Sequence, residues 1–152
     1  MPAVSSVGYC AKKPRLLERA IRRGAKGDRR LHWERLFFDG NFNTVLSPQA
    51  AGKYAEALQM VRLGPSASNR QPWRVLKDGD DWHFYLNRTP GYRQRRLVKL
   101  TSTADLQRVD MGIAMCHFEL AIRQLGLDGG WEHDDPGIEV DEYTEYSCSW
   151  ES

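Results

Sequence analysis

The chain has 152 residues and a net charge of +2, and 41% of its residues are hydrophobic, which favours one globular domain over a disordered chain. No apolar run is long enough to span a bilayer, and the first residues lack the charged and apolar regions of a secretory signal. The three cysteines, Cys10, Cys116 and Cys148, have no metal-ligand spacing and are interpreted as reduced thiols. These features predict a cytoplasmic protein with a single domain over residues 1–152.

The charges are distributed unevenly along the chain. Ten Lys and Arg residues stand against three acids between residues 12 and 35, whereas nine acids and no Lys or Arg occur from residue 128 onward. A basic segment can bind nucleic acid, but no known nucleic-acid-binding motif accompanies this one. We therefore expect the two ends to neutralise each other in part or to face water, without a nucleic-acid partner.

The first forty residues predict short elements. Residues 2–9 have the pattern of a strand, and residues 12–26 that of a basic helix closed by Gly24 and Gly27. Residues 33–40 form an aromatic-rich segment that ends in a turn, and we expect it to pack across another surface.

The central part of the chain predicts a helix followed by a hairpin. Ser47 and Pro48 are typical of a helix N-terminus, and Gly64 stands where a helix would end. Apolar residues recur at helical spacing between them: Ala51, Tyr54, Ala55, Leu58 and Val61. Residues 73–77 and 82–87 flank a turn sequence and predict two antiparallel strands. No element is predicted for the basic residues 92–100.

The longest predicted helix runs from Thr103 to about Leu125, with Gly126 as its stop. It carries two apolar stripes, one of Leu106, Val109, Ile113, Cys116 and Leu120, the other of Met111, Met115, Phe118 and Ile122. Two stripes indicate a helix that is buried on more than one side, with Cys116 and His117 as packing residues. A turn at Pro136-Gly137 precedes a closing strand at residues 143–150.

Several classes of catalytic site have no support in the sequence. The four histidines are scattered and form no cluster with cysteines, so no metal site is predicted. No serine stands in a recognisable hydrolase motif, and no glycine-rich phosphate loop occurs.

One polar loop, residues 64–74, remains as the candidate site. Pro65 and Pro72 prevent a regular helix or strand from continuing through it. Between them lie four side chains that can donate and accept hydrogen bonds, namely Ser66, Ser68, Asn69 and Gln71.

The order of residues in this loop resembles the Pro-Ser-x-x-Asn-x-Gln-Pro-Trp-Arg segment of the FMN-dependent nitroreductase family. Residues 110–115 and the sequence Gly126-Leu127-Asp128-Gly129-Gly130-Trp131 are similar to that family's later helix and its exit. The chain as a whole looks most like the second half of a subgroup in which one long chain holds two nitroreductase-like halves, and residues 4–9 and 37–40 also fit that pattern. The resemblance implies an α+β fold with helices packed on an antiparallel or mixed sheet, which could be only half of a complete two-unit fold.

The resemblance also implies a cofactor, a reaction and a set of contacts. It assigns FMN contacts to Ser66, Ser68, Asn69 and Gln71, with Pro65 and Ala67 shaping the loop, and no side chain as a catalytic acid or base. The implied reaction is NAD(P)H-dependent oxidoreduction, in which reducing equivalents pass through the flavin to a nitro, quinone or similar small acceptor. The family's early arginine-rich motif for the FMN phosphate has no counterpart here, although Arg70 and Arg74 could help to neutralise a phosphate.

Three alternatives stay open at this point. The first is an active enzyme that needs a partner, either a second copy in a homodimer or a separately encoded first half, which the basic segment 1–40 could wrap. The second is a non-catalytic or truncated half-domain that acts in assembly. The third, a nucleic-acid-associated protein that uses the basic segment, is the least supported by the sequence.

Overall fold

The computed structural model describes residues 23–24, 26–91 and 104–152. The predicted strand at residues 2–9, nearly all of the predicted helix at residues 12–26, the segment 92–100 and Cys10 lie outside these residues. In chain order the elements are η1 (Trp33–Arg35), β1 (Phe37–Asp39), β2 (Asn41–Val45), α2 (Pro48–Ala51), η2 (Gly52–Tyr54), α3 (Ala55–Leu63), η3 (Ala67–Asn69), β3 (Trp73–Asp78), β4 (Asp81–Asn87), α5 (Leu106–Gln124), β5 (Gly130–Glu132) and β6 (Thr144–Glu151).

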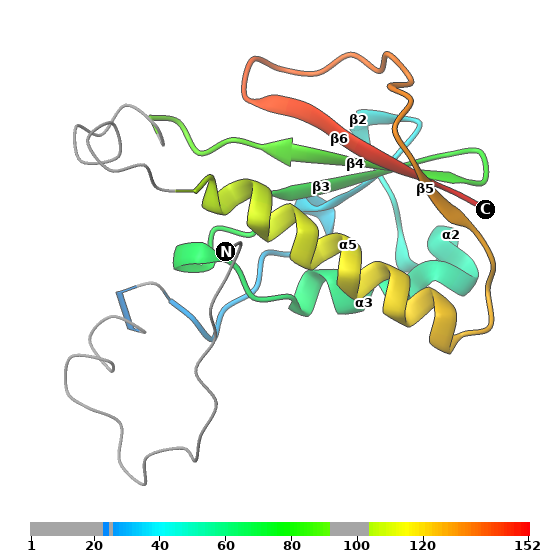
Figure 1. Ribbon diagram of the computed structural model, residues 1–152, viewed down its shortest axis with the longest axis horizontal. Helices are drawn as coiled ribbons and strands as arrows, with labels where there is room; N and C mark the ends of the chain where they lie inside the picture. The colour runs from blue at the N-terminus through cyan, green and yellow to red at the C-terminus, as the bar shows by residue number, and fades with distance from the viewer. Residues whose placement is uncertain (1–22, 25, 92–103) are drawn as a thin grey trace, which may run out of the picture.

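The six strands form one mixed sheet in the order β2-β1-β3-β4-β6-β5. Among the described strands, β1 and β3 pair in parallel, and the other neighbouring pairs are antiparallel. Helices α3 and α5 pack against each other on one side of the sheet, and residues 133–143 run along the other side (Figure 1). The α+β class and the mixed sheet predicted from the sequence are confirmed.

The two central strands are the predicted hairpin. β3 and β4 pair from Trp73 with Leu86 to Asp78 with Asp81, which leaves Gly79 and Asp80 as a two-residue turn. Alternate side chains of β4 point to opposite faces of the sheet. Phe84 therefore belongs to the core under the helices, whereas Tyr85 is buried on the other face.

The predicted helix between Ser47 and Gly64 is present but interrupted. The Ser47 hydroxyl accepts a hydrogen bond from the Ala50 amide (3.0 Å) and caps α2, with Pro48 as the first helical residue. A 3₁₀ turn, η2, then separates α2 from α3. The aromatic segment at residues 33–40, expected only to pack across a surface, instead supplies β1, which lies inside the sheet.

Helix α5 begins later and is buried less than the sequence predicts. Its N-cap is Asp105 rather than Thr103, and the Asp105 side chain accepts from the Arg108 amide. The stripe of Met111, Phe118 and Ile122 faces the core, but Leu106, Val109 and Leu120 are 43%, 52% and 62% exposed and Cys116 is also exposed. The prediction of burial on both stripes is wrong, because the sheet and α3 cover only part of the helix circumference.

An aromatic cluster connects α5 to the sheet. The Phe118 ring is fully buried and lies between rings from η2, β4, β5 and β6, namely Tyr54, Trp82, Phe84, Trp131 and Trp150. After α5 the chain turns through Gly126, whose φ is +67°, and the Leu127 amide donates to the Ile122 carbonyl (3.1 Å). Gly129 (φ +146°) lies so close to the Trp150 ring that a Cβ at this position would overlap the ring. Because glycine has no Cβ, the chain can approach Trp150 here and β5 can pair with β6.

Candidate functional site

The loop singled out in the sequence, residues 64–74, joins α3 to β3 and has an unusual backbone. Ser68, Asn69 and Gln71 have φ values of +51°, +54° and +49°. Residues other than glycine rarely adopt this left-handed conformation, and they keep it only where the surroundings hold it. Ser66 supplies part of that support, because its carbonyl accepts from the Asn69 amide (2.9 Å) and its hydroxyl from the Gln71 amide (2.8 Å).

A carboxylate on α5 fixes the loop to the helix layer. Asp110 Oδ1 accepts a hydrogen bond from the Ala67 amide at 2.9 Å, and the side chain is only 3% exposed. Its other oxygen, Oδ2, is buried and has no hydrogen-bond partner among the described residues. Burial raises the pKa of Asp110 above its ordinary value, because a charged carboxylate is poorly solvated there, and the Ala67 amide opposes this shift. Asp110 is thus a positioning residue for the loop.

The two amide side chains of the loop hold the basic segment that precedes β1. Asn69 Nδ2 donates to the carbonyls of Lys26 (2.7 Å) and Arg29 (2.8 Å). Gln71 Oε1 accepts from the Leu31 amide (2.8 Å), and Gln71 Nε2 donates to Asn69 Oδ1 (3.1 Å). Both amides therefore have their hydrogen-bonding groups engaged within the chain.

The loop and the basic segment enclose a cavity of about 630 Å³, which we call the loop cavity. Among the described residues, its charged lining residues are cationic: Lys26, Arg29, Arg30 and Arg70. Arg30 is held by backbone carbonyls, including that of Leu63 (3.2 Å), rather than by a carboxylate. Several cations in the lining of one cavity attract an anion.

Only some of the predicted site residues reach the loop cavity. Ser68, Asn69 and Gln71 line it, whereas Pro65, Ser66 and Ala67 are not among its lining residues. Sequence reasoning missed Lys26, Arg29 and Arg30 as site residues, although the density of positive charge just before β1 was a visible signal. Arg74, considered for the same role as Arg70, lines a different cavity.

The comparisons with known proteins agree with the motif in the loop. The family model described as "Putative TM nitroreductase" matches residues 41–122, more than half of the chain. The chain belongs to this nitroreductase family. No curated protein matches the sequence.

A crystal structure of a "putative nitroreductase" from Thermotoga maritima is similar to this nitroreductase-family chain, with 19% identity and a TM-score of 0.48. The match covers 80% of this chain and 41% of that chain, so the sequence spans less than half the length of that protein. The more specific assignment to the second half of a two-half subgroup stays a prediction.

Two other potentially reactive side chains of this nitroreductase-family chain, His83 and Cys148, are buried. His83 is 7% exposed, its Nδ1 lies 2.7 Å from Ser149 Oγ, and burial lowers its pKa. Burial also raises the pKa of the Cys148 thiol to about 12, so this thiol is unreactive at neutral pH. Within residues 23–24, 26–91 and 104–152, no group of three or more His, Cys, Asp or Glu residues could hold a metal ion. The same part of the chain contains no helix long and apolar enough to cross a membrane.

Proposed function

We propose that the chain is a flavin-dependent oxidoreductase of the nitroreductase type, with FMN bound at the loop cavity. The observation that carries the proposal is that the loop, whose sequence resembles the family's segment, lines a cavity in which four described residues are cations. Lys26, Arg29, Arg30 and Arg70 would neutralise the FMN phosphate, a role for which the sequence offered no arginine motif. Nitroreductase-family proteins are generally flavin-dependent, which supports the same assignment.

The residues of the loop would have two roles, contact with the flavin and support of the loop backbone. Ser68, Asn69 and Gln71 line the cavity and would contact the flavin directly. Ser66, Pro65 and Ala67 would fix the loop backbone, and Asp110 would hold the loop on α5. Bound FMN would supply the redox chemistry, accepting a hydride from NAD(P)H and passing reducing equivalents to a nitro, quinone or similar acceptor. No side chain of this chain is assigned as catalytic. We place this activity in the cytoplasm, where thiols stay reduced.

A second candidate function is favoured by the hydrogen bonds of the loop amides. Asn69 and Gln71 are already paired with Lys26, Arg29 and Leu31, so a flavin can use these amides only after they exchange partners. A chain in which this exchange does not occur would be a non-catalytic half-domain that acts in assembly.

Titration with two flavins distinguishes the two functions. We expect FMN to bind more tightly than riboflavin, which lacks the phosphate, and Arg70→Gln to reduce FMN affinity severalfold while leaving riboflavin affinity unchanged. Arg123→Gln is the matched control, because it removes the same charge from an arginine that does not line the loop cavity. Arg123 lies near the end of α5 and pairs with Glu119 at 2.6 Å. Asn69→Ala should weaken both flavins. Absence of flavin binding in the correctly folded wild type would favour the assembly role.

We further propose that a second nitroreductase-like unit completes the site, either another copy or a separately encoded first half. The exposed stripe of α5, together with Met60 and Leu63 of α3 (36% and 44% exposed), supports this proposal, because apolar side chains on neighbouring helices are typical of an interface. The single domain over residues 1–152 would contribute its basic segment 1–40 to contacts with that unit.

Light scattering with flavin quantitation tests the partner proposal. A dimer that carries flavin would indicate self-association, and conversion to monomer by Leu120→Gln would locate the interface on α5. A monomer that retains one FMN per chain would contradict the need for a second unit.

A further inference from the structure

A second cavity, of about 570 Å³, lies on the sheet face opposite the helices and shares no lining residue with the loop cavity. We call it the Arg74 cavity. Its walls come from β1 and β2, from the central hairpin, and from the loop before β6, and include Phe38, Phe42, Asn43, Arg74, Glu139 and Asp141. Its volume is in the range of small-molecule binding sites, about 300–1,000 Å³.

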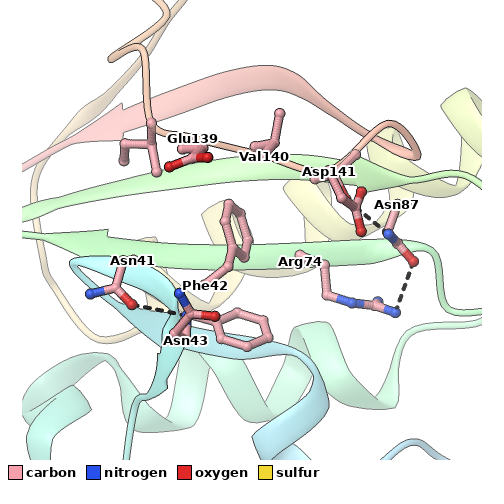
Figure 2. Close-up of a pocket in the computed structure, with 11 residues that line it drawn as sticks. Asn41, Phe42, Asn43, Arg74, Asn87, Glu139, Val140 and Asp141 are labelled. Atoms are coloured by element: carbon pink, nitrogen blue, oxygen red, sulfur yellow. Dashed lines mark hydrogen bonds between the residues drawn. The ribbon is translucent and has the colours of Figure 1, made fainter.

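Among the described lining residues, Arg74 is the cation of this cavity, and its observed hydrogen-bond partners are neutral. Nη1 donates to the carbonyls of Gln71 (3.2 Å) and Trp73 (2.6 Å), and Nη2 donates to Asn87 Oδ1 (3.3 Å; Figure 2). These bonds leave Nε–H and one Nη2–H without an acceptor among the described residues. Guanidinium N–H groups of this kind can bind a carboxylate through charge-assisted hydrogen bonds.

The electrostatics of Arg74 favour the binding of an anion. Burial, and the positive charge of Arg35, lower the pKa of Arg74 to about 10, and Asp141 offsets only part of this shift. No carboxylate of the described residues lies within ion-pair distance of the guanidinium, whereas Arg88, on the following stretch of chain, pairs with Asp105 (2.7 Å) and Glu145 (2.6 Å). Among the described residues, Arg74 thus has no ion pair, whereas Arg88 has two.

The other walls define the rest of the ligand. Phe38 and Phe42 lie edge to face with centroids 5.2 Å apart, and Phe42 also contacts Tyr85, which gives the cavity an aromatic wall. Glu139 and Asp141 lie on the facing loop in Figure 2. Their charges disfavour a ligand with more than one negative charge, such as a phosphate, and an aromatic wall favours a planar apolar body.

We propose that the Arg74 cavity binds a small aromatic monocarboxylate, with its carboxylate on the free N–H groups of the Arg74 guanidinium and its ring against Phe42 and Phe38. This site is separate from the proposed flavin site. The binding energy comes from the charge-assisted pair and from burial of the ring, so neither part alone should bind well.

Calorimetric titration with naphthalene-2-carboxylate tests the proposal, with naphthalene-2-carboxamide as the uncharged probe. We expect the carboxylate to bind at least about tenfold more tightly than the carboxamide, as the loss of a charge-assisted pair implies. Arg74→Lys keeps the charge but loses the guanidinium N–H groups, and it should weaken the carboxylate by a similar factor. Arg123→Lys, the same change on the exposed side of α5, should leave binding unchanged.

A second variant distinguishes a loss of binding from a folding defect caused by the substitution of Arg74. Asn43 is exposed on β2 and lines the cavity, so Asn43→Trp should fill the cavity and abolish binding while circular dichroism stays as in the wild type. Equal affinity for the carboxylate and the carboxamide, or full binding by Arg74→Lys, would overturn the proposal. Loss of binding in Arg70→Lys instead of Arg74→Lys would place the ligand in the loop cavity and would overturn it as well.

Discussion

Replacement of Phe118 by alanine measures how α5 is oriented on the sheet. Phe118 is fully buried and its ring contacts five other aromatic rings. Removing a buried phenylalanine ring from a packed core lowers the free energy of unfolding by about 3–5 kcal/mol. Because domains are typically stable by only about 5–15 kcal/mol, Phe118→Ala should unfold at a much lower urea concentration.

The control for this variant lies two residues further along the same helix. Leu120 is 62% exposed, and Leu120→Ala should change the free energy of unfolding by no more than about 0.5 kcal/mol. Urea unfolding followed by far-ultraviolet circular dichroism gives both values, at a concentration where light scattering shows a monomer, since association would bury Leu120. Equal losses for the two monomeric variants would mean that α5 does not turn its Phe118 side toward the sheet.

Three further changes have defined outcomes. Gly129→Ala should destabilise the protein by more than about 2 kcal/mol in a urea melt, because its Cβ would overlap an indole ring at a positive φ, whereas Gly130→Ala has open space and should cost far less. His83 has a lowered pKa in the folded state, so the free energy of unfolding should fall as the pH drops below 6.5, the ordinary pKa of histidine. A His83→Gln variant with the same pH dependence as the wild type would contradict this. Asp110→Ala removes the acceptor of the Ala67 amide, and hydrogen exchange at that amide should accelerate by about tenfold. An unchanged exchange rate would mean that Asp110 does not hold the loop.

The sequence predicted the elements whose contacts are local. The hairpin of β3 and β4 followed from two alternating segments around a short turn, and the Ser47 cap followed from neighbouring residues alone. Periodicity also showed which side chains of α5 share a face, but it could not show that Leu120 and Val109 would lie outside the core. That outcome depends on how much of the helix the sheet and α3 cover, which is a property of the tertiary structure.

The candidate site was predicted only in part, because some of its contacts are local in sequence and others are not. The order of polar residues identified the loop, because Asn69 and Gln71 stand close together in the motif. Their partners Lys26 and Arg29 lie about forty residues earlier, and no local pattern connects two segments at that distance. The parallel pairing of β1 with β3 likewise joins strands that are distant in the chain.

The aromatic cluster around Phe118 provides an optical measure of folding that requires no label. Its rings come from η2, α5 and three strands, and the Trp131 and Trp150 rings lie edge to face with centroids 5.1 Å apart. Fixed, asymmetric aromatic surroundings produce a near-ultraviolet circular dichroism signal, which is lost when secondary structure persists without tertiary packing. Near-ultraviolet dichroism will therefore report whether a variant has docked all of these elements together, whereas far-ultraviolet dichroism will report only that its helices and strands exist.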